Sequence, residues 1–223
     1  MNIFLATEST EDTEVKNKVM TNEAIKMVLE IINTVAIITA SGVAIYGINA
    51  WKKEFSGKRK IELAEEVLAL FYEARDAISA IRSPFGFQGE GSTRKPQENE
   101  TPREKNARDR AYVVYERFEK RQEVFNKLHS KRYQFMARFG NEKAKPFEDF
   151  RIIVIEIQIS ASQLEEIWSE VTFDQYDRDT LKKERKEHES IIRQHGKNDI
   201  IDTRVEKIIS DIEKVCRPII MGK

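Results

Sequence analysis

The sequence predicts an all-α protein in which one N-terminal transmembrane helix precedes a cytosolic antiparallel helical bundle, a coiled-coil-like domain of four to five helices. Three observations predict this fold class. One long apolar run carries no charge, apolar residues elsewhere recur every three or four positions, and helix breakers are scarce, with nine Gly and five Pro among 223 residues. A charged fraction of 34% suits long solvated helices.

The apolar run lies near the N-terminus. A polar tail, residues 1–29, precedes it, and the predicted membrane helix covers residues 30–52. The 21 residues from Ile31 to Trp51 include no acidic or basic side chain of Asp, Glu, Lys, Arg or His. At a rise of about 1.5 Å per residue they extend roughly 31 Å, close to the thickness of a bilayer's hydrocarbon core. The alternative is a buried core helix, which is usually shorter and carries a charge. A cleaved signal peptide is not expected, because the run is too long and follows an acidic leader.

The flanking charges predict the orientation of this helix. Residues 1–30 carry six acidic and three basic side chains, whereas the residues just after the span are mostly basic. The positive-inside rule therefore places the C-terminal side in the cytoplasm and the N-terminus outside, as in a single-pass protein of the plasma membrane. The same cations could also bind anionic lipid headgroups. The predicted membrane-interface residues are Trp51, Lys52, Lys53, Lys58, Arg59 and Lys60.

Small residues recur along one side of the predicted span. Ala36, Ala40 and Ala44 are spaced by four, and Gly47 continues their line one turn further on. In lipid, helices associate largely through close backbone contact at such small residues. The ridge therefore predicts a homo-oligomer formed through the membrane helix.

Apolar spacing and breakers divide residues 58–223 into helices. The first ends at Pro84 and Gly86, and a polar segment at about 83–106 is expected to be a mobile loop. Phe85 and Phe87 in this segment are expected to cover the end of the bundle. A heptad-like run then extends from residue 111 to 139 as one helix, and Gly140 ends it.

A second heptad-like run, residues 147–171, follows after a short connection, so the two helices are expected to fold back as an antiparallel hairpin. Its segment "RIIVIEIQIS" also alternates as a strand would. We expect a helix there, because the heptad spacing continues on both sides and no partner strand is visible. A charged helix up to Gly196 and an amphipathic helix up to Pro218 complete the domain.

Residue patterns that carry chemistry are missing from the sequence. A di-iron bundle requires Glu three positions before His, and none of the three histidines has one. Cys216 is the only cysteine, so it forms no intramolecular disulfide and is expected to pack rather than react. The balance of 38 basic and 38 acidic residues argues against a nucleic-acid partner. We therefore expect no enzymatic activity, cofactor or metal site.

The segment "WKKEFSGKRKIELAEEVLALFYEARDAISAIRSPF", residues 51–85, resembles a segment of uncharacterised bacterial single-pass membrane proteins. In these proteins an N-terminal membrane helix precedes a Trp-basic-basic-Glu turn and a helix ending at a Pro-Phe pair. The resemblance implies membrane anchorage, a cytosolic helical domain and a bacterial source, and it implies no activity.

Two functions are compatible with these features. The first is a membrane-anchored helical interaction or scaffold module that oligomerises or holds an unidentified cytosolic protein partner. The alternative is an effector of a bacterial defence or toxin system, whose membrane helices assemble and perturb the bilayer. The even charge and the heptads favour the first, and the small-residue ridge motivates the second.

Overall fold

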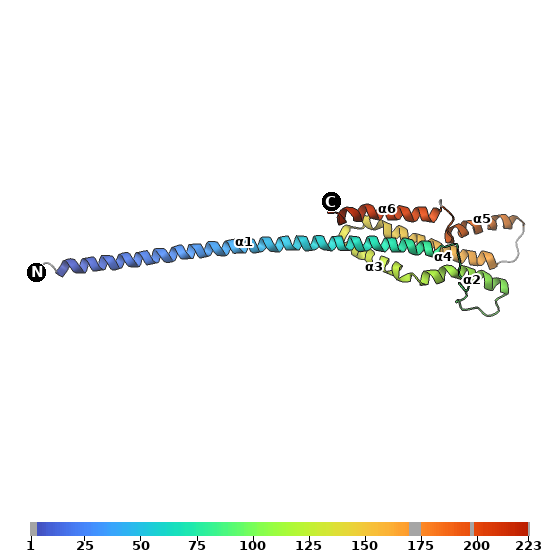
Figure 1. Ribbon diagram of the computed structural model, residues 1–223, viewed down its shortest axis with the longest axis horizontal. Helices are drawn as coiled ribbons and strands as arrows, with labels where there is room; N and C mark the ends of the chain where they lie inside the picture. The colour runs from blue at the N-terminus through green and yellow to red at the C-terminus, as the bar shows by residue number, and fades with distance from the viewer. Residues whose placement is uncertain (1–3, 170–174, 197–198, 223) are drawn as a thin grey trace. The chain divides into compact units, whose positions relative to one another are not determined.

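The computed structural model describes residues 4–169, 175–196 and 199–222, and every element in these ranges is helical (Figure 1). The chain divides into two compact units, an N-terminal unit of residues 1–58 and a C-terminal unit of residues 59–223. The helices are α1 (Phe4–Ile81), α2 (Pro102–Glu119), α3 (Gln122–Phe139), the short 3-10 helix η1 (Glu142–Ala144), α4 (Lys145–Ser169), α5 (Gln175–Ile192) and α6 (Ile200–Ile220).

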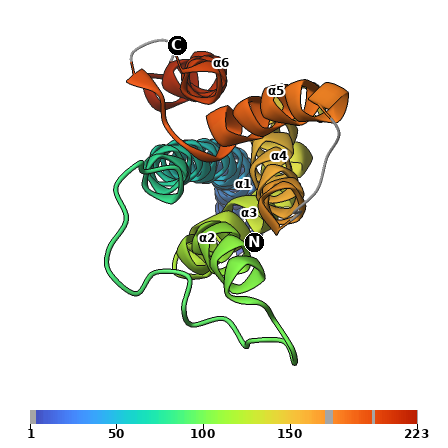
Figure 2. The ribbon, with the colours of Figure 1, turned by 90° about the vertical axis from the view of Figure 1, so that its right-hand side faces the viewer.

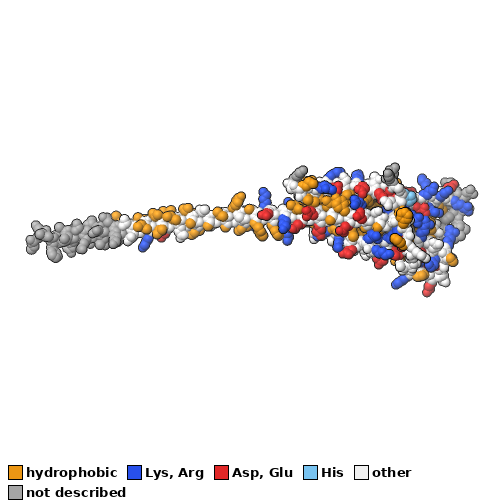
Figure 3. Space-filling view, in the orientation of Figure 1, with side chains coloured by type: hydrophobic (Ala, Val, Ile, Leu, Met, Phe, Trp, Pro, Cys, Tyr) orange, Lys and Arg blue, Asp and Glu red, His pale blue; other side chains and the backbone are white. Residues whose placement is uncertain are grey.

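The N-terminal unit contains the apolar helix that the sequence predicts. Its side chains from residue 20 onward are exposed through the whole predicted span, and Figure 3 shows the apolar ones along this part of α1. Among the described residues, α1 is the one helix long and apolar enough to cross a membrane, and none of its most apolar window is buried. A core helix of a soluble protein would be mostly buried, so this surface lacks the cover that a protein core provides.

The C-terminal unit has a continuous hydrophobic core to which every α-helix of the unit contributes. Phe71 of α1 packs edge-on against Phe147 and Phe150 of α4, with ring centroids 4.9 and 5.9 Å away. Figure 2 shows α4 beside α2 and α5, and α4 also packs against α6. The segment that alternates like a strand, residues 151–160, lies within α4 and is helical, as predicted. Its isoleucines are not buried on several faces, as their number had suggested: Ile153 and Ile157 are buried, whereas Ile152, Ile155 and Ile159 are exposed.

Local sequence explains several helix ends. The Thr101 side chain accepts a hydrogen bond from the Glu104 amide, and the Glu104 side chain accepts one from the Thr101 amide, which forms a capping box with Pro102 at the first position. As a result α2 begins at residue 102, inside the segment expected as a loop. Gly140 ends α3 with a φ of 93°, a conformation that favours glycine. The mobility expected for residues 83–106 stays a prediction.

Two expectations for this unit are wrong. The heptad-like run 111–139 is not one helix, because a turn at Lys120 and Arg121 separates α2 from α3. The break brings the rings of Phe118 and Phe125 into a stack with centroids 5.0 Å apart, closer than seven residues of straight helix would allow. Phe85 and Phe87 do not cover the core, since each remains 80% exposed.

Candidate functional site

The predicted membrane-interface residues all lie on α1. Trp51 is 62% exposed and stacks on Phe55, with ring centroids 5.5 Å apart. Lys52, Lys53 and Lys58 are exposed in the N-terminal unit, and Arg59 and Lys60 are exposed at the start of the C-terminal unit. An aromatic pair followed by exposed lysines has the composition of a helix end at a membrane surface.

The predicted ridge also lies on an exposed part of α1. Ala36, Ala40, Ala44 and Gly47 share one side of the helix by their spacing, and all four are exposed. A Cβ added to Gly47 would meet no atom within 4 Å. The structure therefore leaves this side open to a neighbouring helix, and association through it stays a prediction.

Hydroxyl groups within the apolar run are satisfied by their own helix. Thr34, Thr39 and Ser41 each donate a 2.8 Å hydrogen bond to the carbonyl four residues earlier. In hydrocarbon an unpaired hydroxyl is costly, and this back-bonding removes the cost without a partner. The sequence did not reveal this arrangement, although Ser and Thr in an apolar helix commonly adopt it.

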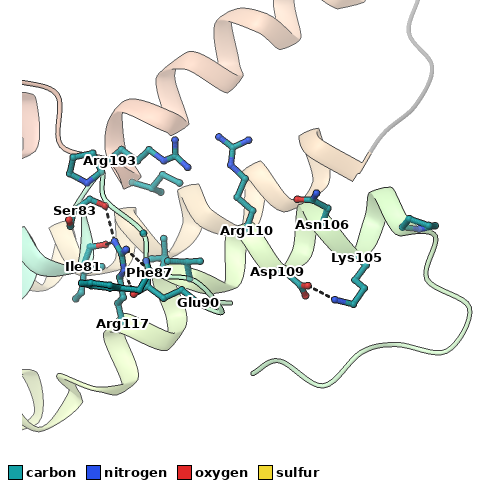
Figure 4. Close-up of a pocket in the computed structure, with 16 residues that line it drawn as sticks. Ile81, Ser83, Phe87, Glu90, Lys105, Asn106, Asp109, Arg110, Arg117 and Arg193 are labelled. Carbon is teal, nitrogen blue, oxygen red and sulfur yellow. Dashed lines mark hydrogen bonds and ion pairs between the residues drawn. The ribbon is translucent and has the colours of Figure 1, made fainter. Parts of the chain in front are cut away.

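A cavity of about 600 Å³ lies in the C-terminal unit. Its walls are the end of α1 with the residues that follow it, one side of α2 from Pro102 to Arg117, and the end of α5 (Figure 4). Apolar side chains such as Ile81 and Val113 line it together with charged groups, including Glu90, Lys105 and Arg110. Sequence reasoning missed this cavity, because its walls come from segments far apart in the chain.

Arg117 fixes one wall of the cavity. Only 7% exposed, it donates to the carbonyls of Ser83 (2.8 Å) and Phe85 (2.6 Å) and pairs with the Glu90 carboxylate at 2.6 Å (Figure 4). The hydrogen bond from Arg117 holds the pKa of Glu90 below its ordinary value. Gly91 then lies so close to α2 that an added Cβ would be 1.9 Å from the Asp109 carbonyl oxygen. Polar contacts thereby attach the residues after α1 to α2.

Behind the cavity lies a buried charge cluster that the sequence also did not reveal. Arg82 is fully buried and pairs with Asp199 at 2.8 Å and Asp202 at 2.7 Å. Its guanidinium also donates to the carbonyls of Ser190, Ile191 and Arg193 at the end of α5. One side chain therefore joins the ends of α1 and α5 to the start of α6.

Asp199 is the acidic centre of this cluster. Burial alone would raise its pKa, but hydrogen bonds from Arg82 and from the backbone amides of Asp202 and His195 outweigh that effect and lower the pKa to about 2. Asp199 is also the N-cap of α6. The Asp199 carboxylate thus forms the ion pair with Arg82 and also caps α6, which indicates a structural role.

The described residues offer little reactive chemistry. Cys216 is fully buried, and burial raises its pKa to about 12, so the thiol packs as predicted. No group of three or more His, Cys, Asp or Glu in residues 4–169, 175–196 and 199–222 is placed to hold a metal ion.

The resemblance of residues 51–85 to single-pass bacterial membrane proteins stays an expectation. In comparisons with protein-family models, with curated proteins and with solved structures, nothing matched this chain.

Proposed function

We propose that this protein is a membrane-anchored helical interaction module. In this proposal residues 30–52 cross the bacterial inner membrane, the N-terminus lies outside, and the C-terminal unit is an antiparallel helical bundle in the cytoplasm that oligomerises or holds a cytosolic protein partner. The observation that carries the proposal is the uncovered apolar surface of α1, where large side chains such as Ile38 and Val43 are 66% and 67% exposed. Lipid is the natural cover for a surface of this length.

The energetics of insertion support the anchor. Six Ile and two Val between residues 31 and 51 contribute about −2 to −5 kcal/mol together, at roughly −0.3 to −0.6 kcal/mol each. The back-bonded hydroxyls of Thr34, Thr39 and Ser41 add little opposing cost. The basic residues after Trp51 support a cytoplasmic C-terminal unit.

The helical arrangement supports the bundle. Only Gly140, Asn141 and the short helix η1 separate α3 from α4, and a connection of this length favours antiparallel neighbours. Phe135 of α3 meets Phe147 of α4 with centroids 5.3 Å apart. These contacts between neighbouring helices support a folded helical domain that could present a surface to a partner.

Membrane extraction tests the anchor. The full chain expressed in bacteria should fractionate with membranes and resist carbonate and high salt, because hydrocarbon burial is insensitive to ionic strength. Replacing Ile38 with Arg at the centre of the span should weaken insertion by about 3 kcal/mol or more and raise the extractable fraction, whereas Ile38→Leu should not. Recovery of the unmodified full chain as soluble protein without detergent would refute the proposal.

Self-association through the ridge is a separate part of the proposal. Ala40→Leu with Ala44→Leu should weaken association in a membrane two-hybrid assay, because bulk at the ridge separates the backbones. Ile38→Leu with Ile45→Leu changes the opposite side of the helix and serves as the matched control. Equal association of the ridge variant and the parent chain would show that the ridge is irrelevant.

The second candidate function is a membrane-perturbing effector, and the ridge is the observation that favours it. Dye release from vesicles reconstituted with the full chain would distinguish the two functions. We favour the anchor, because Thr34, Thr39 and Ser41 turn their hydroxyls back to their own helix. That leaves few polar groups to line a path for water.

A further inference from the structure

The cavity at the ends of α1 and α5 has unusual electrostatics. Among the residues that line it, two carboxylates and four cations face one space. Both carboxylates are already neutralised, since Glu90 pairs with Arg117 at 2.6 Å, and Asp109 pairs with Lys105 at 2.7 Å (Figure 4) and with Arg94 at 2.9 Å. The cations that remain are Arg110 and Arg193.

The negative charge beside Arg110 and Arg193 is too small to balance the positive charges of these two arginines. Glu189 is the acidic group beside them, at 3.7 Å from Arg110, but it already forms a 3.0 Å pair with Arg185. Burial, together with repulsion from Arg193 and Arg185, holds the pKa of Arg110 below its ordinary value. The Arg193 side chain makes no hydrogen bond or ion pair with any residue that the structure describes. Arg110 therefore shares the Glu189 carboxylate with Arg185, and Arg193 adds a further positive charge beside Arg110.

The remaining surface of the cavity is suited to an organic group. Phe87 lines the cavity and is 80% exposed, so the face of its ring is available for stacking. Ile81, Val113 and Ile192 add apolar walls. A volume of about 600 Å³ is within the range of small-molecule sites, and it is much larger than an inorganic anion requires.

We propose that this cavity binds a small organic phosphate, with the phosphate at Arg110 and Arg193 and a planar apolar portion against Phe87. Guanidiniums suit this role because they offer paired N–H donors in the geometry of phosphate oxygens. Figure 4 shows Arg110 extending from α2 toward the side on which Arg193 lies. The site lies wholly within the C-terminal unit, so it does not depend on membrane anchoring.

The chain contains its own reporter for this site. The Arg110 guanidinium lies 4.1 Å from the centroid of the Trp168 ring. An anion that binds Arg110 changes the electrostatic environment of this indole and therefore its fluorescence. The chain has two tryptophans, so the change Trp51→Phe leaves Trp168 as the single emitter.

Titration of the full chain with nucleotides tests the proposal. The Trp51→Phe protein in neutral detergent micelles would be titrated with ATP, AMP and inorganic phosphate, and separately with micelles containing phosphatidylserine. Fluorescence of Trp168 and isothermal titration calorimetry would both be recorded. We expect saturable binding of a nucleotide that is tighter than binding of inorganic phosphate. Arg193→Gln should weaken it by about tenfold or more, because a charge-assisted hydrogen bond is lost.

Arg151→Gln is the matched control, since Arg151 is an exposed arginine of α4 paired with Glu148. This change should leave the affinity unchanged. Three outcomes would overturn the proposal: no saturable binding of either nucleotide, nucleotide binding that Arg193→Gln does not weaken, or inorganic phosphate bound as tightly as the nucleotides. A response to phosphatidylserine micelles alone would assign the arginines to a lipid headgroup and would also overturn it.

Discussion

Replacing the fully buried Arg82 with Met tests whether the charge cluster behind the cavity holds the C-terminal unit together. Arg82 donates five hydrogen bonds, to three carbonyls, Asp199 and Asp202. Methionine keeps the apolar stem and removes every donor. Because Asp199 is left buried without its partner, we expect a loss of about 3–5 kcal/mol in the free energy of unfolding.

Urea denaturation of the full chain in detergent micelles would measure this loss. Trp168 in the Trp51→Phe background reports on the C-terminal unit alone. Arg75→Met is the matched control, because Arg75 is 38% exposed, pairs with Asp76 at 3.1 Å and should cost no more than about 1 kcal/mol. Adding Asp199→Asn to Arg82→Met should recover part of the loss, since Asn is uncharged and still caps α6. A cost below about 1 kcal/mol for Arg82→Met would refute the reasoning.

Three further predictions concern the same unit. The pKa of Asp199 is lowered to about 2 in the folded protein, so its ionisation contributes roughly 2 kcal/mol to the free energy of unfolding. This contribution is present above about pH 4 and should be lost as the pH falls toward 2, as urea midpoints measured across this range would show. Gly91→Ala should lower the free energy of unfolding by about 1–3 kcal/mol, because φ at Gly91 is 84° and the new Cβ would overlap the Asp109 carbonyl. Gly89→Ala, at a φ of 90° but without such an overlap, should be less destabilising, as thermal melting of both variants would show. Cys216 should resist a thiol reagent at pH 8 until the chain unfolds, since it is buried with a pKa of about 12; rapid labelling of the native protein would contradict its placement.

Periodic features of this protein could be predicted from the sequence. The apolar run on α1 and the helical state of residues 151–160 follow from spacing that repeats over many turns, so a local ambiguity is outweighed by its neighbours. The break at Lys120 and Arg121 could not be predicted in this way. Neither Gly nor Pro marks it, and ring stacking between Phe118 and Phe125 accompanies it.

The candidate site depends on pairs that are remote in sequence. Arg82 meets Asp199 across 117 positions, and Arg117 meets Phe85 across 32. A charged residue in a sequence with 34% charged residues gives no sign of which opposite charge it will meet. The burial of Arg82 could therefore not be predicted from the sequence. The exposure of Phe87 was also not predicted, because its apolar character alone suggested that it covers the end of the bundle.

The connection between α1 and α2 is held mostly by charges and very little by apolar contact. Glu90 is paired with Arg117, the Gly91 amide donates to Glu116, and Arg94 is paired with Glu100, while Phe85 and Phe87 stand in solvent. A segment with so little apolar burial opens independently of the helices and shows a smaller dependence on urea than global unfolding does. Native-state hydrogen exchange should thus separate the Gly91 amide from the amides of α4, because the Gly91 amide should exchange through a local fluctuation and those of α4 only on global unfolding.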